Sequence, residues 1–250
     1  AATMVLWEYA HIVAKDHAWL RRVSVTAGSL GLGLALQSHD AAHAALALFA
    51  ASAVVVAEFT LRSPKLGDDY NDVAAAALGL PLIGVGLGSV YFLRVLPQQP
   101  GWPDAGIAWI YVAFAMTWLN DTFAYFSGRL FGKHKLYEAV SPKKTWEGLV
   151  GGGLGALVVC ILVKALVVDP LAPNFLSPVS YADLLAIGVP CMGLAPLGDL
   201  MESRLKRCYG VKDSGSLIPG HGGFFDRVDA LMMVAPWVLF YVVALRPLWR

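Results

Sequence analysis

The sequence predicts an all-α, polytopic integral membrane protein with about seven transmembrane helices, and three observations support this fold class. First, 57% of the 250 residues are hydrophobic and only 15% are charged, whereas soluble domains carry about a quarter charged residues. Second, seven apolar segments reach or approach the length needed to cross about 30 Å of hydrocarbon. Third, these segments are uniformly apolar and lack the period-two alternation of barrel strands, which favours helices.

The expected spans follow one another along the whole chain. They are Val23–Gln37, Ala41–Leu61, Val73–Leu96, Ala105–Phe126, Trp146–Val168, Tyr181–Gly198 and Asp229–Leu248. Ala1–Tyr9 is interpreted as the last turns of a further helix, and the missing initiator Met predicts that the chain begins inside a longer one. Because no repeat or linker is visible, we expect one membrane domain over 1–250. It would have amino-terminal helices over 1–119, a catalytic region over 120–229 and a last helix over 229–250.

The placement of Lys and Arg predicts which loops face the cytoplasm. Of the 19 Lys and Arg, all but Arg94, Lys164, Arg246 and Arg250 fall on loops that share one side of the seven-span arrangement. Such an excess is typical of cytoplasmic loops. The net charge of +1 provides no global field that would attract nucleic acid, so no nucleic-acid partner is expected.

Three acids fall near the expected cytoplasmic ends of spans: Asp121, Asp199 and Asp226. Charges at membrane depth are costly and usually mark a pathway or a site. Carboxylates from separate helix ends suit Mg²⁺, which completes its shell with water and substrate phosphate. One or two such ions can stabilise a phosphoryl-type displacement. The alternative is that each acid pairs with a neighbouring Arg or caps a helix.

A basic stretch, Ser141–Gly148, precedes the expected fifth span and reads S-P-K-K-T-W-E-G. Thr145 or Ser141 can cap the helix, and the exposed amides together with Lys143 and Lys144 would form an anion site. The alternative is that the two lysines hold anionic lipid headgroups.

A second basic set follows the sixth span, where Ser203, Lys206 and Arg207 would share one helical face. Beyond it, the turn Pro219–Gly223 can bring backbone amides close to a phosphate, since Gly tolerates the required dihedrals. His221 in this turn would donate to a phosphate or act as an acid. The alternative is a structural hydrogen bond.

These motifs together resemble the phosphatidate cytidylyltransferase family, also called the CDP-diacylglycerol synthases. The family's signature is a Ser followed by Lys-Arg, Lys-Asp, Pro-Gly-His-Gly-Gly and Asp-Arg-x-Asp, and it occurs between Ser203 and Asp229 without departure. The upstream half also matches, at Asp121–Tyr125, Gly128, Gly132–Leu136 and Ser141–Gly148. The similarity covers about Asn120 to Asp229, whereas the amino-terminal third matches only as apolar helices.

The resemblance implies transfer of a cytidylyl group from CTP to phosphatidic acid, which yields CDP-diacylglycerol and pyrophosphate in phospholipid biosynthesis. It implies one or two Mg²⁺ ions held by Asp199 and Asp226, with Asp121 as a third ligand or a base contact, and Lys206 as a further catalytic residue. The residues implied in binding substrate or phosphate are Ser141, Lys143, Lys144, Ser203, Arg207, Lys212, Asp213, His221, Gly222, Gly223, Arg227 and Asp229.

The implied partners are CTP, phosphatidic acid and the bilayer, at the cytoplasmic side of a bacterial inner membrane. The glycine-rich spans are also compatible with a homodimer. Two alternatives stay open. A CTP-dependent lipid or polyprenol kinase would also need a metal, a nucleotide and a membrane alcohol. An ion-coupled transporter would place its site near the bilayer midplane between repeated halves, whereas these acids lie towards one face.

Overall fold

The computed structural model describes residues 2–38, 41–62, 69–96, 105–173, 175–176, 179–215, 217 and 222–248. Most of these residues lie in helices, which confirms the expected all-α class. Within these described ranges, five helical segments are long and apolar enough to cross a membrane: His43–Leu61, Asn71–Arg94, Trp146–Leu171, Tyr181–Cys208 and Leu231–Leu248. The protein is therefore an integral membrane protein.

The backbone divides into two compact units. The first comprises Ala1–Gly88 and Leu205–Val228, and the second comprises Ser89–Arg204 and Asp229–Arg250. Helices α4 (Asp69–Arg94) and α8 (Tyr181–Cys208) contribute residues to both. The expectation of a single membrane domain stays a prediction.

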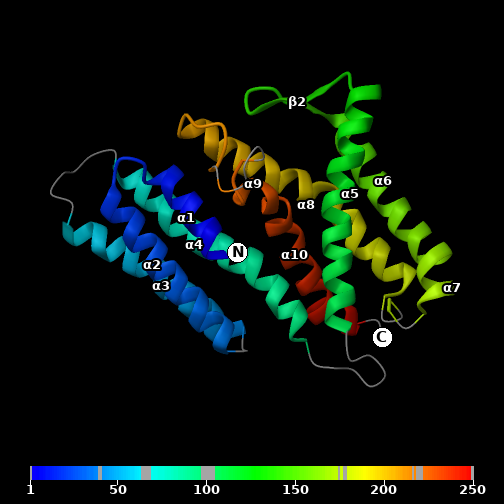
Figure 1. Ribbon diagram of the computed structural model, residues 1–250, viewed down its shortest axis with the longest axis horizontal. Helices are drawn as coiled ribbons and strands as arrows, with labels where there is room; N and C mark the ends of the chain where they lie inside the picture. Colours follow the sequence, from blue (N-terminus) through cyan, green and yellow to red (C-terminus); the bar gives the residue numbers. More distant parts are fainter. Residues whose placement is uncertain are drawn as a thin grey trace. The chain divides into compact units, whose positions relative to one another are not determined.

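The first unit begins with α1 (Ala2–Val13), α2 (Ala18–Ser38) and α3 (Ala41–Arg62). Figure 1 shows α2 and α3 side by side, as the short connection between them predicts. Gly31 permits this close packing, because a Cβ there would lie 2.8 Å from the Ala51 Cβ and 3.0 Å from the Ala47 carbonyl oxygen.

Helix α1 is anchored by Tyr9, which is buried. The Tyr9 hydroxyl donates to the Ala75 carbonyl of α4 at 2.8 Å. Its ring also meets the ring of Phe225 edge-on, with centroids 5.8 Å apart. Phe225 begins the short helix α9 (Phe225–Val228), so the first helix of the chain packs against one of the last.

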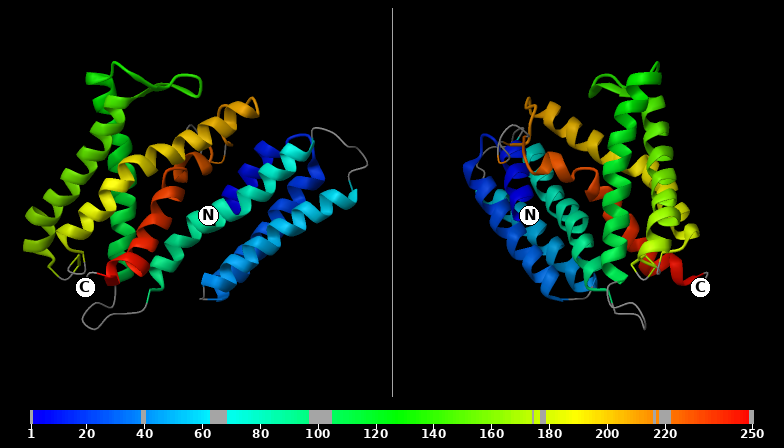
Figure 2. Two further views of the ribbon diagram at one scale, coloured as in Figure 1. Left: turned by 180° about the vertical axis from the view of Figure 1, so that it is seen from behind. Right: turned by 45° about the vertical axis from the view of Figure 1, so that its right-hand side comes forward.

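The second unit contains α5 (Ala105–Phe131), α6 (Trp146–Val163) and most of α8. A π-helical turn, η1 (Lys164–Val168), and the short α7 (Asp169–Leu171) follow α6. The views of Figure 2 show α5 and α6 running alongside each other. A Cβ on Gly152 would lie 2.8 Å from the Asn120 carbonyl oxygen, so glycine at this position lets the two backbones approach.

A short hairpin connects α5 to α6, which is a departure from an all-helical chain. Strands β1 (Lys135–Tyr137) and β2 (Ser141–Thr145) are antiparallel. At the end of β2, Thr145 has extended dihedrals (φ −130°, ψ 157°), and its hydroxyl oxygen accepts from the Gly148 N–H at 3.1 Å. Of the two expected capping residues, Thr145 is therefore the one that starts α6.

A buried ion pair joins α8 to the end of the chain. The last span continues from α10 (Leu231–Phe240) into the π-helical turn η2 (Tyr241–Leu245) and the 3₁₀ turn η3 (Arg246–Leu248). Asp183, in the first turn of α8, accepts hydrogen bonds from the Tyr241 hydroxyl at 2.6 Å and from Arg246 Nε at 3.3 Å. Since Asp183 and Arg246 are both buried, this contact fixes the register between the helix that carries Asp199 and the span that follows Asp229.

Two functional segments are more helical than expected. Helix α8 continues beyond Gly198 to Cys208, so that Asp199 and Ser203 lie on successive turns of one helix. Helix α5 likewise runs to Phe131. Asp121 therefore lies within a helix and not at its end, because α5 continues beyond it for more than two turns.

Candidate functional site

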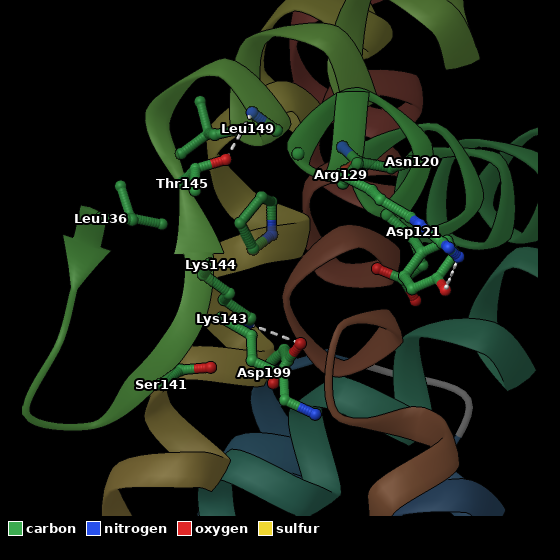
Figure 3. A pocket seen from close by; sticks show the side chains of 15 residues that line it. Asn120, Asp121, Arg129, Leu136, Ser141, Lys143, Lys144, Thr145, Leu149 and Asp199 are labelled. Atoms are coloured by element: carbon green, nitrogen blue, oxygen red, sulfur yellow. Dashed lines mark hydrogen bonds and ion pairs between the residues drawn. The ribbon is translucent and has the colours of Figure 1, made fainter. Parts of the chain in front are cut away.

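A pocket of about 560 Å³ lies in the second unit, between α5, the hairpin, α6 and α8. Figure 3 shows how these elements contribute the polar side chains. Strand β2 supplies Ser141, Lys143 and Lys144, α5 supplies Asp121, and α8 supplies Asp199. The pocket therefore combines two ammonium groups, a hydroxyl and two carboxylates, which is a suitable lining for a phosphate compound.

The hairpin connects the basic stretch directly to an acid of α8. Lys144 Nζ lies 2.5 Å from Asp199 Oδ2, and the two side chains are 24% and 34% exposed. The neighbouring Lys143 is exposed, whereas Thr145 on the other side is buried and begins α6. Because side chains alternate along a strand, β2 sends Lys144 towards α8 while it anchors itself through Thr145.

Three carboxylates gather beside this ion pair. Asp199 and Glu202 are three residues apart on α8, and Asp229 comes just before α10; each offers an oxygen within 4.8 Å of the other two. Residues three apart lie on one helical face. Ser203 donates its hydroxyl to Asp199 Oδ1 at 3.2 Å, and the Ala230 N–H donates to Asp229 Oδ1 at 2.7 Å. We call Asp199, Glu202 and Asp229 the carboxylate cluster.

The electrostatics of the carboxylate cluster suit a cation. Burial, together with the nearby Asp199 carboxylate, raises the pKa of Asp229 to about 7. Like charges this close oppose each other's ionisation, and a bound cation favours the ionised forms. Hard carboxylate oxygens that converge from two chain segments are the donors that Mg²⁺ prefers. The cluster therefore fits the divalent ion expected from the sequence, although its membership differs from the expected set.

Asp226, the other expected metal ligand, belongs to the first unit and has a different environment. Its Oδ1 accepts from Lys206 Nζ at 2.6 Å. Its Oδ2 accepts from the Ser214 N–H at 3.1 Å, the Ser214 hydroxyl at 2.9 Å and the Gly223 N–H at 2.9 Å. The preceding Gly222 has φ = 81°, a left-handed conformation that favours glycine. We call Asp226, Lys206, Ser214 and Gly223 the Asp226 network.

The other expected site residues are distributed as follows. Arg207, Lys212, Asp213 and Arg227 are exposed, and Arg207 donates to the Val211 carbonyl at 3.4 Å. His221 lies outside the described residues. The structure thus brings Asp121, Ser141, Lys143, Lys144 and Asp199 to one pocket, Asp199 and Asp229 to one cluster, and Lys206, Gly223 and Asp226 to one network. The individual roles of all these residues stay predictions.

Sequence reasoning did not include Glu202, Arg129 or Glu8 in the site. Glu202 could have been found, because the spacing D-x-x-E on a helix places it beside Asp199. Arg129 lines the pocket and donates to the Tyr125 hydroxyl at 3.2 Å. Glu8 gives no sequence signal, because the residues it contacts lie more than 200 positions away in the chain.

Comparison with known proteins agrees with these features. The profile of the Cytidylyltransferase family matches residues 1–245. A phosphatidate cytidylyltransferase of Staphylococcus saprophyticus is 40% identical over 167 residues, which are 67% of this chain and 58% of the relative. The corresponding protein of Thermotoga maritima is 38% identical over 170 residues (67% and 60%), and that of Staphylococcus epidermidis is 38% identical over 186 residues (74% and 65%).

In each of these alignments the chain spans less than two thirds of the relative's length. The family profile, in contrast, extends over nearly the whole chain and includes both the carboxylate cluster and the Asp226 network. The chain therefore belongs to the Cytidylyltransferase family.

Proposed function

We propose that this protein is a CTP:phosphatidate cytidylyltransferase, which transfers CMP from CTP to phosphatidic acid and releases pyrophosphate. Family membership and the names of the relatives support the reaction class. The observation that carries the proposal is the contact between Lys144 and Asp199, because it joins a phosphate-binding pocket to a carboxylate cluster. A nucleotidyl transfer needs these two elements next to each other.

In this proposal the pocket binds the triphosphate of CTP. Lys143, Lys144 and Arg129 supply positive charge, and Ser141 supplies a hydroxyl donor. Ammonium and guanidinium groups form charge-assisted hydrogen bonds with phosphate oxygens. A phosphate held by Lys144 lies beside Asp199, since the lysine contacts that carboxylate at 2.5 Å.

The carboxylate cluster would hold Mg²⁺ through Asp199, Glu202 and Asp229. When bound, a divalent cation neutralises charge on the triphosphate and on the oxygens of the displacement. Asp226 and Asp121 remain proposed as further ligands. Ser203 and the Ala230 amide hold two of the three carboxylates in place, which limits the reorganisation that binding would require.

In this reaction the protein mainly has to position the reacting groups and stabilise negative charge. An oxygen of the lipid phosphate attacks the α-phosphorus of CTP; a new P–O bond forms, and the bond to the β-phosphate oxygen breaks as pyrophosphate leaves. Because the attacking phosphate is already an anion, no strong base is needed. The lysines stabilise the departing negative charge, and the pocket aligns the reacting groups.

The membrane-spanning helices place the pocket where a lipid substrate could reach it in this proposal. Helices α6 and α8, which both contribute residues to the pocket, are long and apolar enough to lie in the bilayer. We propose that the headgroup of phosphatidic acid reaches the pocket at the cytoplasmic face of a bacterial inner membrane while its acyl chains stay in hydrocarbon. The excess of Lys and Arg on the site-bearing loops supports this side. A homodimer is compatible with the glycine-rich spans and belongs to the same proposal.

A direct assay tests the reaction. The purified protein in lipid nanodiscs receives CTP labelled on the α-phosphate together with either phosphatidic acid or diacylglycerol. We expect a labelled lipid and stoichiometric pyrophosphate with phosphatidic acid, and no turnover with diacylglycerol. Release of CDP with phosphorylation of diacylglycerol would instead identify a lipid kinase and overturn the proposal.

A further inference from the structure

A buried carboxylate in the first helix has no place in the reaction described above. Glu8 of α1 is fully buried, and it lies inside the first unit on the face of α1 that packs against α9. A buried acid is costly unless its oxygens are hydrogen-bonded. Its hydrogen-bond partners should therefore show why the chain has an acid at this position.

The Glu8 carboxylate accepts hydrogen bonds from the segment that leads into α9. Oε1 accepts from the Phe224 N–H at 2.9 Å, and Oε2 accepts from the Phe225 N–H at 2.7 Å. Each oxygen thus holds one of two successive backbone amides. A carboxylate that bridges neighbouring amides in this way fixes their orientation more firmly than one neutral acceptor would.

Two glycines make this close approach possible. A Cβ on Gly215 would lie 2.8 Å from Glu8 Oε1, and a Cβ on Gly223 would lie 2.6 Å from Glu8 Oε2. A side chain at either position would push the carboxylate away from the amides. Gly223 also donates its N–H to Asp226, so one residue lies against both acids.

Ser214 provides a second connection between the two acids. Its hydroxyl lies 3.3 Å from Glu8 Oε2 and 2.9 Å from Asp226 Oδ2. A serine hydroxyl carries one proton, and the shorter distance favours donation to Asp226. Glu8 Oε2 is a second acceptor beside this hydroxyl, so it limits the orientations that the hydroxyl can adopt. The orientation of Asp226 therefore depends on Glu8 through Ser214 and through the 223–225 backbone.

We propose that Glu8 is a positioning residue, whose carboxylate oxygens hold the 223–225 backbone and Ser214 so that Asp226 keeps one orientation towards Lys206. The proposal rests on the proposed function, in which Asp226 serves the transfer reaction. In this role Glu8 acts through the groups that bind Asp226. The amino-terminal helix thereby contributes to a site whose recognisable motifs all lie beyond Asn120.

Glu8→Gln is the decisive variant, since it keeps the shape of the side chain but replaces one acceptor oxygen with an NH₂ group. Either Phe224 or Phe225 then faces a donor, and its amide loses a partner. We expect kcat to fall about tenfold, a free-energy difference of about 1.4 kcal/mol, with the KM for CTP nearly unchanged. Ser214→Ala should lower kcat by a similar factor, and the double variant should lose little more than either single one, because residues in one network are non-additive.

Amide hydrogen exchange provides a readout that does not need turnover. In Glu8→Gln, the amides of residues 223–226 should exchange at least tenfold faster than in the wild type, while those of α6 stay unchanged. Unchanged exchange in this segment would overturn the positioning role even if activity fell. If the wild type lacked cytidylyltransferase activity but Glu8→Gln still loosened the segment, the proposed function would fail and the positioning role would stand.

Tyr9→Phe is the matched control. It removes a buried hydrogen bond from the next residue of the same helix, to Ala75, and leaves the Glu8 contacts in place. We expect a lower unfolding temperature but wild-type kcat and wild-type exchange at residues 223–226. An equal fall in kcat for Tyr9→Phe and Glu8→Gln would mean that general anchoring of α1 explains the effect, and would overturn the proposal. If Glu8→Gln does not fold, Ser214→Ala and its exchange pattern still decide the matter.

Discussion

The carboxylate cluster and the Asp226 network contain acids of the same motif, but their surroundings are opposite. In the cluster, three carboxylates face one another within 4.8 Å, with a lysine at the edge. In the network, the described residues supply four hydrogen bonds to a single carboxylate, and one of these comes from a lysine. The cluster thus brings like charges together, whereas Asp226 accepts hydrogen bonds from a lysine, a hydroxyl and two backbone amides.

This difference indicates that the two regions have different roles, one in binding an ion and the other in ordering the chain. Carboxylates that repel one another are stabilised by a ligand of positive charge, so the cluster is suited to bind an ion that comes from outside. A carboxylate that accepts several protein hydrogen bonds orders the chain around it. The acids should therefore respond differently when each is neutralised. Three experiments examine that expectation, and a fourth examines the lysines beside the carboxylate cluster.

The largest expected effect is on turnover in Asp199→Asn. The substitution removes a charge from the carboxylate cluster and a partner from Lys144, while it keeps the size of the side chain. We expect kcat to fall by about 10²–10³-fold, as for loss of a group that stabilises developing charge. The unfolding temperature should be unchanged or slightly higher, because repulsion within the cluster is relieved. Both are measured on the same detergent-solubilised sample, and retained turnover would exclude Asp199 from the site.

Asp226→Asn should lower stability as well as turnover. The nearly buried Lys206 would lose the ion pair that its ammonium forms with Asp226 at 2.6 Å, where the two side chains are only 11% and 13% exposed. Losing a hydrogen-bond partner of a buried charged group costs about 1–3 kcal/mol. We expect a clear fall in the unfolding temperature together with faster amide exchange around Ser214. Equal stability of Asp199→Asn and Asp226→Asn would contradict the contrast drawn between the two regions.

Glu202→Gln tests whether the carboxylate cluster binds the ion. In the wild type, Mg²⁺ at about 100 times its Kd should stabilise the folded state by about 2.7 kcal/mol, and chelation should reverse this shift. In Glu202→Gln, we expect the concentration of Mg²⁺ that produces half of the thermal shift to rise at least tenfold. The same titration on Asp226→Asn shows whether Asp226 also serves as a ligand. An identical Mg²⁺ response in Glu202→Gln and the wild type would remove Glu202 from the ion site.

The smallest expected effect is on the KM for CTP, and it should differ between variants of the two lysines of β2. Lys144 is half-buried beside Asp199, whereas Lys143 is exposed at the pocket. We expect Lys144→Gln to raise the KM for CTP about tenfold, or about 1.4 kcal/mol. Lys143→Gln should raise it only about two- to threefold, because an exposed charge is screened by water and salt. The reverse order would indicate that Lys143, and not Lys144, makes the main phosphate contact.

Much of the architecture could be predicted from the sequence, because the bilayer strongly restricts the backbone structure that each membrane-spanning segment can form. Uniformly apolar stretches of span length must form helices in hydrocarbon, and the seven expected segments all coincide with helices. The hairpin over Lys135–Thr145 was not expected. Its strands are short and exposed, and they depend on the pairing of Lys135 with Thr145, which leaves no hydrophobic pattern in the sequence.

The residues of the candidate site were recognisable for a similar reason. Charged and glycine-rich motifs stand out in a chain of which 57% is hydrophobic. Recognition of the motif, however, did not say which acids meet. Asp199 and Asp229 belong to one cluster with Glu202, because α8 continues as a helix past Gly198 and brings Glu202 onto the face of Asp199.

The sequence by itself thus determined the membrane-spanning helical class and the polar segments that interrupt it, because hydropathy and helix formation depend on neighbouring residues. Tertiary structure decided the partners: Lys144 with Asp199, Asp229 with Glu202, and Glu8 with the amides of Phe224 and Phe225. Such pairings join residues as much as 217 positions apart. They follow from how whole helices pack, and no local pattern in the chain encodes them.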